Sequence, residues 1–361
     1  MRIVKENYEY DFYKNHELSL PKLQYVNKGL CGLINLGNKC FLNSILFCLS
    51  NTVKLTDYFL SSKYKKDDPE DLNKRKKEYY LVFSYLNLLL NIWDTNQVIK
   101  PKTFVENLSK FVNKYYTLEQ QDSHECLLYI LDILHRGLSY EIEVEINGEI
   151  KNDQDKLVKT SIEHWKTFYE KKYSFIIETF NGLFYNTIDC DNCKISSDVF
   201  EPYNTISLNI PVNDSISLNE CLFNYFNTIE KIDSWKCEKC NELGCKKTNK
   251  LWSVPNYLII HFKRFKNNGQ KINTIVDFDL ENLVLTDYIS KDKKDPNNYI
   301  YSLYAINYHS GSQNAGHYFS CCKNLNNNWY LFNDANVSKI EKENLLKKDA
   351  YILFYYRKFI K

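Results

Sequence analysis

Two C-x-x-C pairs constrain this chain most strongly, because they imply that distant residues meet in space. The pairs are Cys190/Cys193 and Cys237/Cys240. Four thiolates complete the tetrahedral coordination of Zn2+ and leave no position open for substrate or water, so such a site is structural rather than catalytic. A redox C-x-x-C and four unconnected free thiols are the alternative interpretations. The spacing favours zinc, with Cys245 as a possible substitute ligand.

If one metal ion joins the two pairs, the intervening chain forms a lobe that the metal holds at its base. Segments 200–211 and 221–226 lie within this predicted lobe. A metalloenzyme centred on the cysteines is excluded, because a four-cysteine site has no vacancy.

Length and composition narrow the class of protein. The 361 residues, 44% of them hydrophobic, suffice for two or three domains or for one large enzyme with several lobes. A net charge of +2 gives no electrostatic basis for binding nucleic acid or an anionic membrane. The start, MRIVKEN, lacks the apolar segment of a signal peptide, and the apolar run 80–93 is too short to span a bilayer. We therefore expect a soluble intracellular protein, in the cytoplasm, the nucleus or both.

In a reducing compartment the twelve cysteines are expected to be metal ligands, nucleophiles or core residues rather than disulfides.

The order of patterns along the chain predicts an α+β protein, with helices first and strands later. Residues 1–30 form a polar and aromatic arm. Charged or turn-rich stretches at 61–77 and 291–298 are expected to be surface loops. Helical patterns cover 81–93, 104–112, 126–138 and 151–173, and strand patterns cover 187–190, 203–210, 257–262, 299–308, 317–322, 329–332 and 351–355.

Cys40 is a candidate nucleophile. A loop containing Gly32, Asn35, Gly37 and Asn38 precedes it, and helix-like spacing begins directly after it. The exposed N–H groups at a helix start favour an anion, so a thiol there ionises more easily than a free one. A buried structural cysteine is the alternative.

A candidate partner lies far downstream, at the start of a predicted strand. His317 follows a glycine-bearing loop, and the next strand ends with Asn333 and Asp334. A thiol hydrolase needs a histidine to accept the thiol proton and an Asn or Asp to orient the imidazole. If the two strands are adjacent, one of these side chains lies beside His317. His309 is a rival histidine, although its expected loop position suits gating better than catalysis.

A QQDSHE motif at 120–125 carries two acidic residues. Asp122 and Glu125 are three positions apart, so they share one face near the N-terminus of a helix. Helix capping with solvated charge is one interpretation, and an acidic wall for a cationic ligand is the other.

Taken together, these segments resemble the ubiquitin-specific protease family, papain-like cysteine enzymes that remove ubiquitin. The resemblance covers roughly residues 32–355. Six motifs occur in the family's order: the Cys segment at 32–49, the Gln-Gln-Asp-x-x-Glu helix at 120–127, the two C-x-x-C pairs, LIIHFKRF at 258–265, the His segment at 316–334, and AYILFY at 350–355.

The resemblance implies a role for each matching residue. Cys40 matches the nucleophile, His317 the general base and acid, Asn333 the third triad member with Asp334 as a supporting acceptor, and Asn35 the donor to the oxyanion. The substrate would be the ubiquitin C-terminal tail, which carries arginines and ends in two glycines, and acidic residues suit it. The residues expected along this tail are Asp122, Glu125, His309, Ser310, Gly311, Gly316 and Tyr318, and the loop 310–315 would overlie it.

The implied architecture is a helical thumb at about 31–170, zinc-stapled β fingers at about 175–255, and a β palm at about 256–361. The implied function is deubiquitination, with ubiquitin and ubiquitinated proteins as partners, structural Zn2+ as the cofactor and an activating partner left open. Lys39 stands where the family commonly has Thr, and we expect its side chain to be solvated. The same fold acting on another ubiquitin-like modifier and a silent ubiquitin-binding adaptor are the alternatives.

Overall fold

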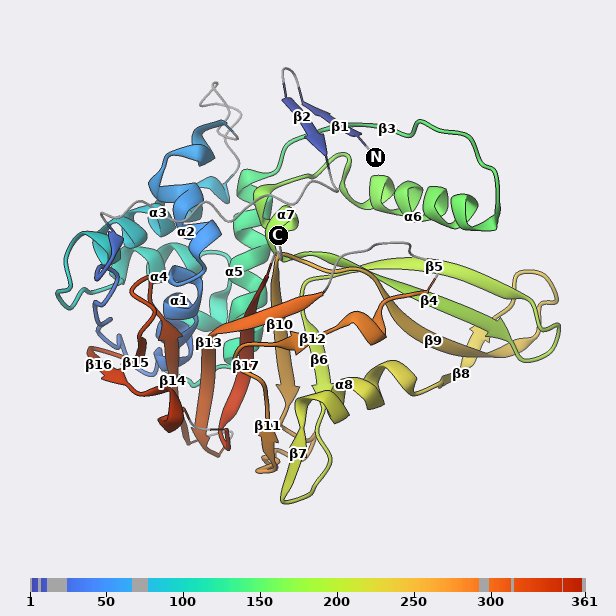
Figure 1. Ribbon diagram of the computed structural model, residues 1–361. Helices are drawn as coiled ribbons and strands as arrows, with labels where there is room; N and C mark the ends of the chain where they lie inside the picture. The colour runs from blue at the N-terminus through green and yellow to red at the C-terminus, as the bar shows by residue number, and fades with distance from the viewer. Residues whose placement is uncertain are drawn as a thin grey trace.

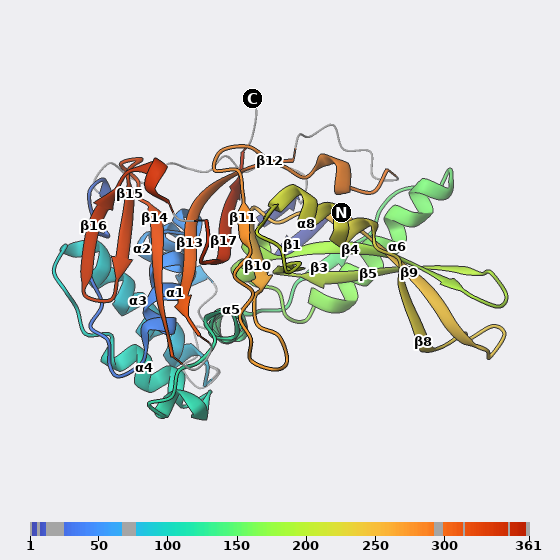
Figure 2. The ribbon, with the colours of Figure 1, turned by 90° about the horizontal axis from the view of Figure 1, so that it is seen from below.

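The computed structural model describes residues 2–5, 8–11, 25–66, 77–291, 299–312, 315–345 and 347–358. A helical lobe comes first in the chain, a long four-stranded sheet follows, and a large central sheet joins them, as Figures 1 and 2 show from two directions. This is the α+β order predicted from the sequence.

The helical lobe is built around one fully buried helix. All eleven residues of α1 (Cys40–Ser50) are buried, because this helix is apolar around most of its circumference and packs against both α5 and strand β14. The other helices of the lobe are α2 (Val53–Leu60), α3 (Tyr79–Asp94), α4 (Lys102–Ser109), α5 (Ser123–Leu138) and α7 (Phe175–Phe180), with 3-10 turns at Lys63–Lys66 and Asn113–Tyr116.

The central sheet, here called the palm sheet, has the strand order β16-β15-β14-β13-β17-β10-β6, with β12 paired to β13. Its strands are β6 (Ile206–Asn209), β10 (Tyr257–Lys263), β12 (Leu283–Val284), β13 (Ile300–Gly311), β14 (Gly316–Lys323), β15 (Trp329–Asn333), β16 (Asn336–Ile340) and β17 (Ala350–Arg357).

Both faces of the palm sheet are covered, which explains its almost continuous apolar strands. Successive side chains alternate between two cores: Ile259 joins the core shared with α1, α3 and α5, while Leu258 and Ile260 join the opposite core. Cys322 and Cys321 divide in the same way. Helix α8 (Leu218–Asn227), started by a Ser217/Glu220 capping box, covers the second face.

The second sheet, here called the finger sheet, has the order β5-β4-β9-β8 and extends away from the palm sheet (Figure 1). Its strands are β4 (Gly182–Cys190), β5 (Ser196–Tyr203), β8 (Glu230–Lys236) and β9 (Leu243–Ser253). Helix α6 (Asp153–Tyr169) packs against β5, where Trp165 and Phe200 lie in one small core.

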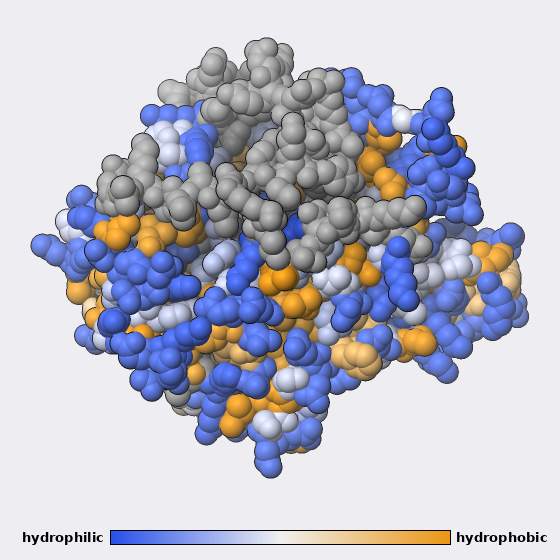
Figure 3. Space-filling view, viewed as in Figure 1, coloured by the Kyte–Doolittle hydropathy of each residue, from blue (hydrophilic) through white to orange (hydrophobic). Residues whose placement is uncertain are grey.

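The remaining elements are short. Strands β1 (Arg2–Lys5), β2 (Tyr8–Asp11) and β3 (Glu143–Glu145) form a three-stranded sheet, β7 (Ser215–Ser217) pairs with β11 (Ile275–Asp277), and 3-10 turns lie at Thr286–Tyr288 and Lys342–Asn344. Outside the residues drawn in grey, the face seen in Figure 3 carries hydrophobic side chains in small groups among hydrophilic ones.

The structure corrects the predicted extent of the lobe that contains the two cysteine pairs. Segment 200–211 was predicted to lie inside the cysteine-pinned lobe, but β6 pairs in parallel with β10 in the palm sheet. Helix α8 packs into the palm core and also against β9 of the finger sheet, so it lies where the two sheets meet. Parts of the predicted arm 1–30 and of the predicted loops 61–77 and 291–298 lie outside the described residues.

Candidate active site

Cys40 is the first residue of α1, as the sequence predicted. Gly37 and Asn38 have positive φ angles of 87° and 50°, which turn the preceding loop into the helix. The loop passes close to the end of β15, because Leu33 N–H donates to the Asp334 carbonyl at 2.8 Å. A Cβ atom on Gly32 would lie 2.1 Å from the Ala335 carbonyl oxygen, so this approach requires glycine.

The environment of the Cys40 thiol differs from the expectation for a helix start. Burial raises its pKa, and the negative charge of Asp334 adds to this rise. Backbone hydrogen bonds from Tyr318, Phe41 and Cys40 itself act in the opposite direction. The predicted effect of the helix amides is therefore present, but burial outweighs it, since the side chain is only 3% exposed.

The predicted adjacency of the two distal strands is confirmed. Strands β14 and β15 pair antiparallel, and His317 at the start of β14 reaches Asn333 at the end of β15. The His317 Nε2 to Asn333 Oδ1 distance is 2.7 Å. Because the next residue along β14, Tyr318, directs its N–H to the Cys40 thiol, the strand brings His317 to the start of α1.

Asp334 has a different set of partners from the one expected. It was predicted to support the imidazole, but its Oδ2 accepts a hydrogen bond from Asn35 Nδ2 at 3.0 Å and its Oδ1 accepts one from Asn43 Nδ2 at 2.8 Å. Its backbone has a φ of 50°, a conformation that is uncommon outside glycine. The carboxylate therefore ties the end of β15 to the Cys40 loop and to α1.

Asn35 lies within this network. Its Oδ1 accepts a hydrogen bond from the Lys39 N–H at 2.9 Å, while one Nδ2 hydrogen goes to Asp334. An amide nitrogen carries two hydrogens, so one donor remains for a further acceptor. Lys39 corrects the expectation of a solvated side chain: it is 3% exposed and donates to the Thr117 carbonyl, and burial lowers its pKa.

Asp122 caps helix α5, which is one of the two roles that the sequence suggested for it. Its Oδ1 accepts from the N–H groups of His124 and Glu125 at the start of α5, and its Oδ2 accepts from the Tyr351 hydroxyl at 2.5 Å. Glu125 pairs with Lys114 and keeps 45% of its side chain exposed. Of the two acidic residues, Glu125 is thus the more accessible.

His309 contradicts the prediction of a loop residue that touches substrate. It lies inside β13, is 1% exposed, and packs edge-on against Phe265. Burial and then the charge of Lys271 lower its pKa to about 4, so the imidazole is neutral at physiological pH. Tyr318, also predicted to lie along the tail, is buried too, with its ring 4.6 Å from that of His309.

The other predicted tail residues lie where β13 turns into β14. Ser310 and Gly311 are exposed at the end of β13, while part of the loop at 310–315 lies outside the described residues. Gly316 is held by the side chain of Gln120, which accepts from its N–H at 3.0 Å and donates to its carbonyl at 2.7 Å.

The four predicted metal ligands converge. The Sγ atoms of Cys190, Cys193, Cys237 and Cys240 all lie within 4.8 Å of one another. Two of the separations are 3.6 Å (Cys190 to Cys240) and 3.7 Å (Cys193 to Cys237), close to the roughly 3.8 Å edge of a tetrahedron with 2.3 Å Zn–S bonds. The set can hold a metal ion, and Cys245, buried in β9, lies outside it.

The position of this cluster corrects the expected lobe. One pair lies at the turn between β4 and β5, and the other at the turn between β8 and β9, so the cluster is at the outer end of the finger sheet rather than at its base (Figure 1). Lys194 and Asn241, which directly follow the two pairs, have positive φ angles of 57° and 62°. The two knuckles therefore turn in the same way.

Several residues of the site were not singled out in the sequence. Asn43 is 1% exposed in a mainly apolar helix, and such a polar residue is a signal for a buried hydrogen bond. A second buried chain runs from Ser123 through Asn307 to Ser44, with both distances 2.8 Å. It joins α5, β13 and α1, and only the three-dimensional structure reveals it.

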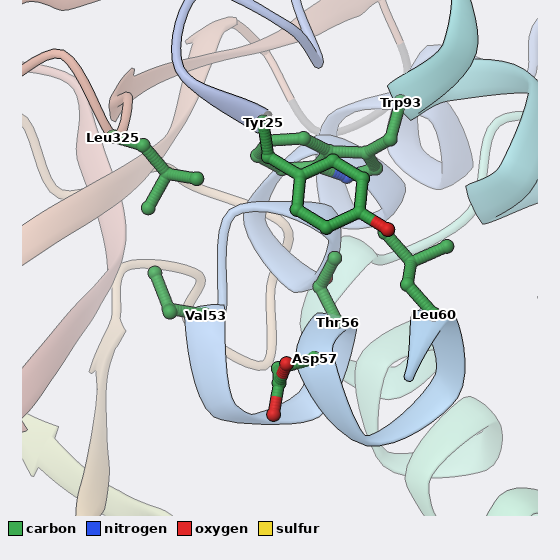
Figure 4. A pocket seen from close by; sticks show the side chains of 7 residues that line it. All are labelled: Tyr25, Val53, Thr56, Asp57, Leu60, Trp93 and Leu325. Atoms are coloured by element: carbon green, nitrogen blue, oxygen red, sulfur yellow. The ribbon is translucent and has the colours of Figure 1, made fainter. Parts of the chain in front are cut away.

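A small pocket elsewhere in the helical lobe is lined by none of the candidate catalytic residues. Tyr25, Trp93, Leu60 and Val53 form most of its apolar wall, and Asp57 at its edge pairs with Lys63 (Figure 4). It lies between Tyr25, one side of α2, Trp93 of α3 and Leu325.

Comparison with known proteins gives consistent matches. The protein-family profile described as "Ubiquitin carboxyl-terminal hydrolase" matches residues 31–355. Among curated relatives, "Ubiquitin carboxyl-terminal hydrolase 2" of Homo sapiens is 32% identical over 345 residues, covering 91% of this chain and 55% of the relative. "Probable ubiquitin carboxyl-terminal hydrolase R319" of Acanthamoeba polyphaga mimivirus is 28% identical and covers 91% of this chain and 90% of the relative. The chain spans about half the length of the first curated relatives it matches.

Solved structures show the same fold. The SAGA Ubp8/Sgf11/Sus1/Sgf73 DUB module bound to ubiquitin aldehyde has a TM-score of 0.71 at 25% identity, covering 93% of this chain and 71% of the other. In the described part of the chain, none of the helices has the length and apolarity needed to cross a bilayer.

Proposed function

Because this chain belongs to the ubiquitin carboxyl-terminal hydrolase family, we propose that it is a deubiquitinase, a thiol hydrolase that cleaves the peptide or isopeptide bond after the C-terminal glycine of ubiquitin. The observation that carries the proposal is a pair of contacts between segments that are distant in sequence. Cys40 at the start of α1 accepts the Tyr318 N–H, and the neighbouring His317 is hydrogen-bonded to Asn333. This is the arrangement that an imidazole-activated thiol requires.

In the proposed first step, the Cys40 sulfur attacks the carbonyl carbon of the last glycine, and a C–S bond forms. His317 accepts the thiol proton, while Asn333 holds its imidazole. Since burial disfavours an isolated thiolate here, proton transfer to His317 accompanies the attack. The carbonyl oxygen becomes an oxyanion that accepts from the free Nδ2 hydrogen of Asn35 and from backbone N–H groups, each donor contributing roughly 3 kcal/mol in a comparable protease.

In the second step, His317 returns the proton to the departing amine as the C–N bond breaks, which leaves a thioester on Cys40. Water then attacks the thioester carbonyl carbon, with His317 as the general base. The C–S bond breaks, His317 returns the proton to the Cys40 sulfur, and ubiquitin is released with a free carboxylate. Asp334 takes no proton in this scheme; it orients Asn35 through the 3.0 Å hydrogen bond between them.

For the substrate tail, the proposed path runs beside α5 and the exposed end of β13. Glu125 would meet a tail arginine, since nearly half of its side chain is exposed, whereas Asp122 would support the wall by capping α5. Ser310 and Gly311 would line the other side. The finger sheet would hold the ubiquitin globule, with a structural Zn2+ bound by Cys190, Cys193, Cys237 and Cys240 at its end.

The cysteine content supports an intracellular site of action. None of the twelve cysteines, all of which lie in the described residues, forms a disulfide, which suits a reducing compartment, and ubiquitin conjugates are the proposed substrates there.

Cleavage of a fluorogenic amide on the ubiquitin C-terminus tests the proposal. We expect turnover by the wild type, none by Cys40→Ala, and wild-type rates for Cys221→Ala, a buried cysteine of the palm core. Equal turnover by Cys40→Ala and the wild type would refute the thiol mechanism. Turnover only with amides of another ubiquitin-like modifier would refute ubiquitin as the substrate, and ubiquitin binding without turnover would indicate a silent adaptor or a required activating partner.

A further inference from the structure

The side-chain amide of Gln120 forms two complementary hydrogen bonds with a single residue, Gly316. Its Oε1 accepts from the Gly316 N–H at 3.0 Å, and its Nε2 donates to the Gly316 carbonyl at 2.7 Å. The side chain thus replaces one residue of a neighbouring β-strand, since it provides one acceptor and one donor to the same strand residue. Gln120 precedes α5, so the bonds run from the helical lobe to the palm sheet.

Strand β14 needs such a partner at this point. On one side, β13 pairs with it along its length, down to Gly311 opposite Gly316. On the other side, the pairing with β15 begins only at Ser320, which lies opposite Phe332. Among the described residues, the first four of β14 therefore have no strand on that side.

Two groups from the helical lobe occupy this open edge. Gln120 bonds Gly316, and the Cys40 thiol accepts the N–H of Tyr318. His317 is the residue between these two points. The backbone of His317 is therefore held by a hydrogen bond at the residue before it, Gly316, and by one at the residue after it, Tyr318.

The fit at Gly316 leaves little freedom. A Cβ atom there would lie 2.2 Å from Nε2 of the buried His309 and 2.8 Å from the Ser312 carbonyl oxygen. His309 thus packs against the backbone of Gly316 while Gln120 holds its edge. Small movements of Gln120 would be transmitted to His317 through a tightly packed segment.

We propose that Gln120 is a positioning residue that acts through Gly316 to fix the His317 imidazole and the Tyr318 N–H relative to Cys40. The proposal rests on the proposed function, because positioning matters only if Cys40 and His317 react together. Other contacts between the two lobes remain when Gln120 is changed, notably Asp122 to Tyr351 and Ser123 to Asn307. The fold should therefore survive the loss of this side chain.

The test variant is Gln120→Met, which keeps the length of the side chain and removes both hydrogen bonds. We expect kcat on the ubiquitin amide to fall roughly 10- to 100-fold, with KM, ubiquitin affinity and Tm unchanged. A second readout needs no ubiquitin: alkylation of Cys40 by iodoacetamide, followed by mass spectrometry of its peptide over a pH series. Its midpoint should move to higher pH, because the Tyr318 N–H that lowers the pKa of Cys40 is no longer held in place.

The matched control is Gln97→Met, since Gln97 is exposed and far from the site residues in sequence. It should match the wild type in both assays. A Gln120→Met protein with wild-type kcat and alkylation profile would overturn the proposal, as would a loss of kcat fully explained by a lower Tm. If Gln120→Met does not fold, Gln120→Glu, which keeps the acceptor for the Gly316 N–H, takes its place under the same criteria. If even the wild type fails to cleave ubiquitin amides, the proposed function fails, whereas the alkylation profiles still decide the role of Gln120.

Discussion

At the scale of single residues, Asp334 connects more of the site than its predicted role as a supporting acceptor implies. Its carboxylate joins Asn35 in the loop and Asn43 in α1, and its backbone carbonyl accepts the Leu33 N–H. A residue held by three hydrogen bonds from two segments keeps its uncommon φ of 50° without relaxing. Yet its charge raises the pKa of Cys40, after the larger effect of burial, so the residue that orders the loop also disfavours the thiolate.

These two effects are separable in Asp334→Asn. Removing the negative charge should lower the pKa of Cys40, so the midpoint of iodoacetamide alkylation moves to lower pH. Turnover of the ubiquitin amide should nevertheless fall about 10-fold or more, because an amide presents a donor to Asn35 or Asn43 where both need an acceptor.

Lys339→Asn, an exposed change on the neighbouring strand β16, is the control and should leave both values unchanged. An Asp334→Asn protein that is both more reactive toward iodoacetamide and fully active would show that the asparagine network has no part in turnover.

At this scale, the sequence predicted which residues lie close together, because residue type and position in a motif indicate such contacts. It did not predict the properties that depend on how deeply a side chain is buried. The meeting of His317 with Asn333 and the start of α1 at Cys40 were predicted. The direction of the Cys40 pKa, the burial of Lys39 and the interior position of His309 were not. Each depends on how much solvent remains after lobes distant in sequence pack together.

At the scale of elements, the outer part of the finger sheet has little hydrophobic core of its own. Strand β8 is mostly exposed, and its register with β9 shifts between Ile232 and Lys236. The four cysteines close the two hairpins at the far end of this sheet. A metal ion there would supply stabilisation that the few buried side chains of β8 do not.

Removing one ligand should therefore loosen the finger sheet. We expect the purified wild type to contain about one zinc per chain, and Cys237→Ser to lose this metal, melt at lower temperature and bind ubiquitin more weakly. Cys245→Ala is the matched control, because Cys245 is a buried cysteine of the same sheet outside the cluster. Metal analysis, thermal unfolding and ubiquitin titration measure these effects. Unchanged thermal stability after a chelator has stripped the metal would contradict the structural role.

The long periodic elements were predictable, and the short or composite ones were not. Helices α3 and α5 and strands β10, β14 and β17 lie where the patterns placed them, within a few residues. Strand β6 was assigned to the wrong sheet, because its four residues carry no information about which strand they will pair with.

At the scale of the whole molecule, a buried chain of hydrogen bonds joins the two lobes. Ser123 of α5 donates to Asn307 of β13, and Asn307 donates to Ser44 of α1, which in turn donates to the Phe41 carbonyl at 3.0 Å. Ser123 and Asn307 are fully buried and Ser44 is 1% exposed. Because every member is satisfied only when the lobes are docked, this chain favours a single arrangement of α1 and α5 on the palm sheet.

Asn307→Leu tests whether that arrangement holds the molecule together. The leucine leaves the Ser123 hydroxyl without its acceptor and the Ser44 hydroxyl without its donor, so we expect the free energy of unfolding to fall by about 2–4 kcal/mol. Because this series of hydrogen bonds ends at Phe41, next to Cys40, kcat should fall further than the lost stability explains, even at temperatures where the variant is fully folded.

Asn87→Leu, which changes an exposed asparagine on α3, is the control and should alter neither the free energy of unfolding nor kcat. Urea unfolding measures the free energy of unfolding, and turnover of the ubiquitin amide at low temperature measures kcat. A variant that loses stability while keeping wild-type kcat would limit the chain to fold stability, and one that loses neither would refute its role in joining the lobes.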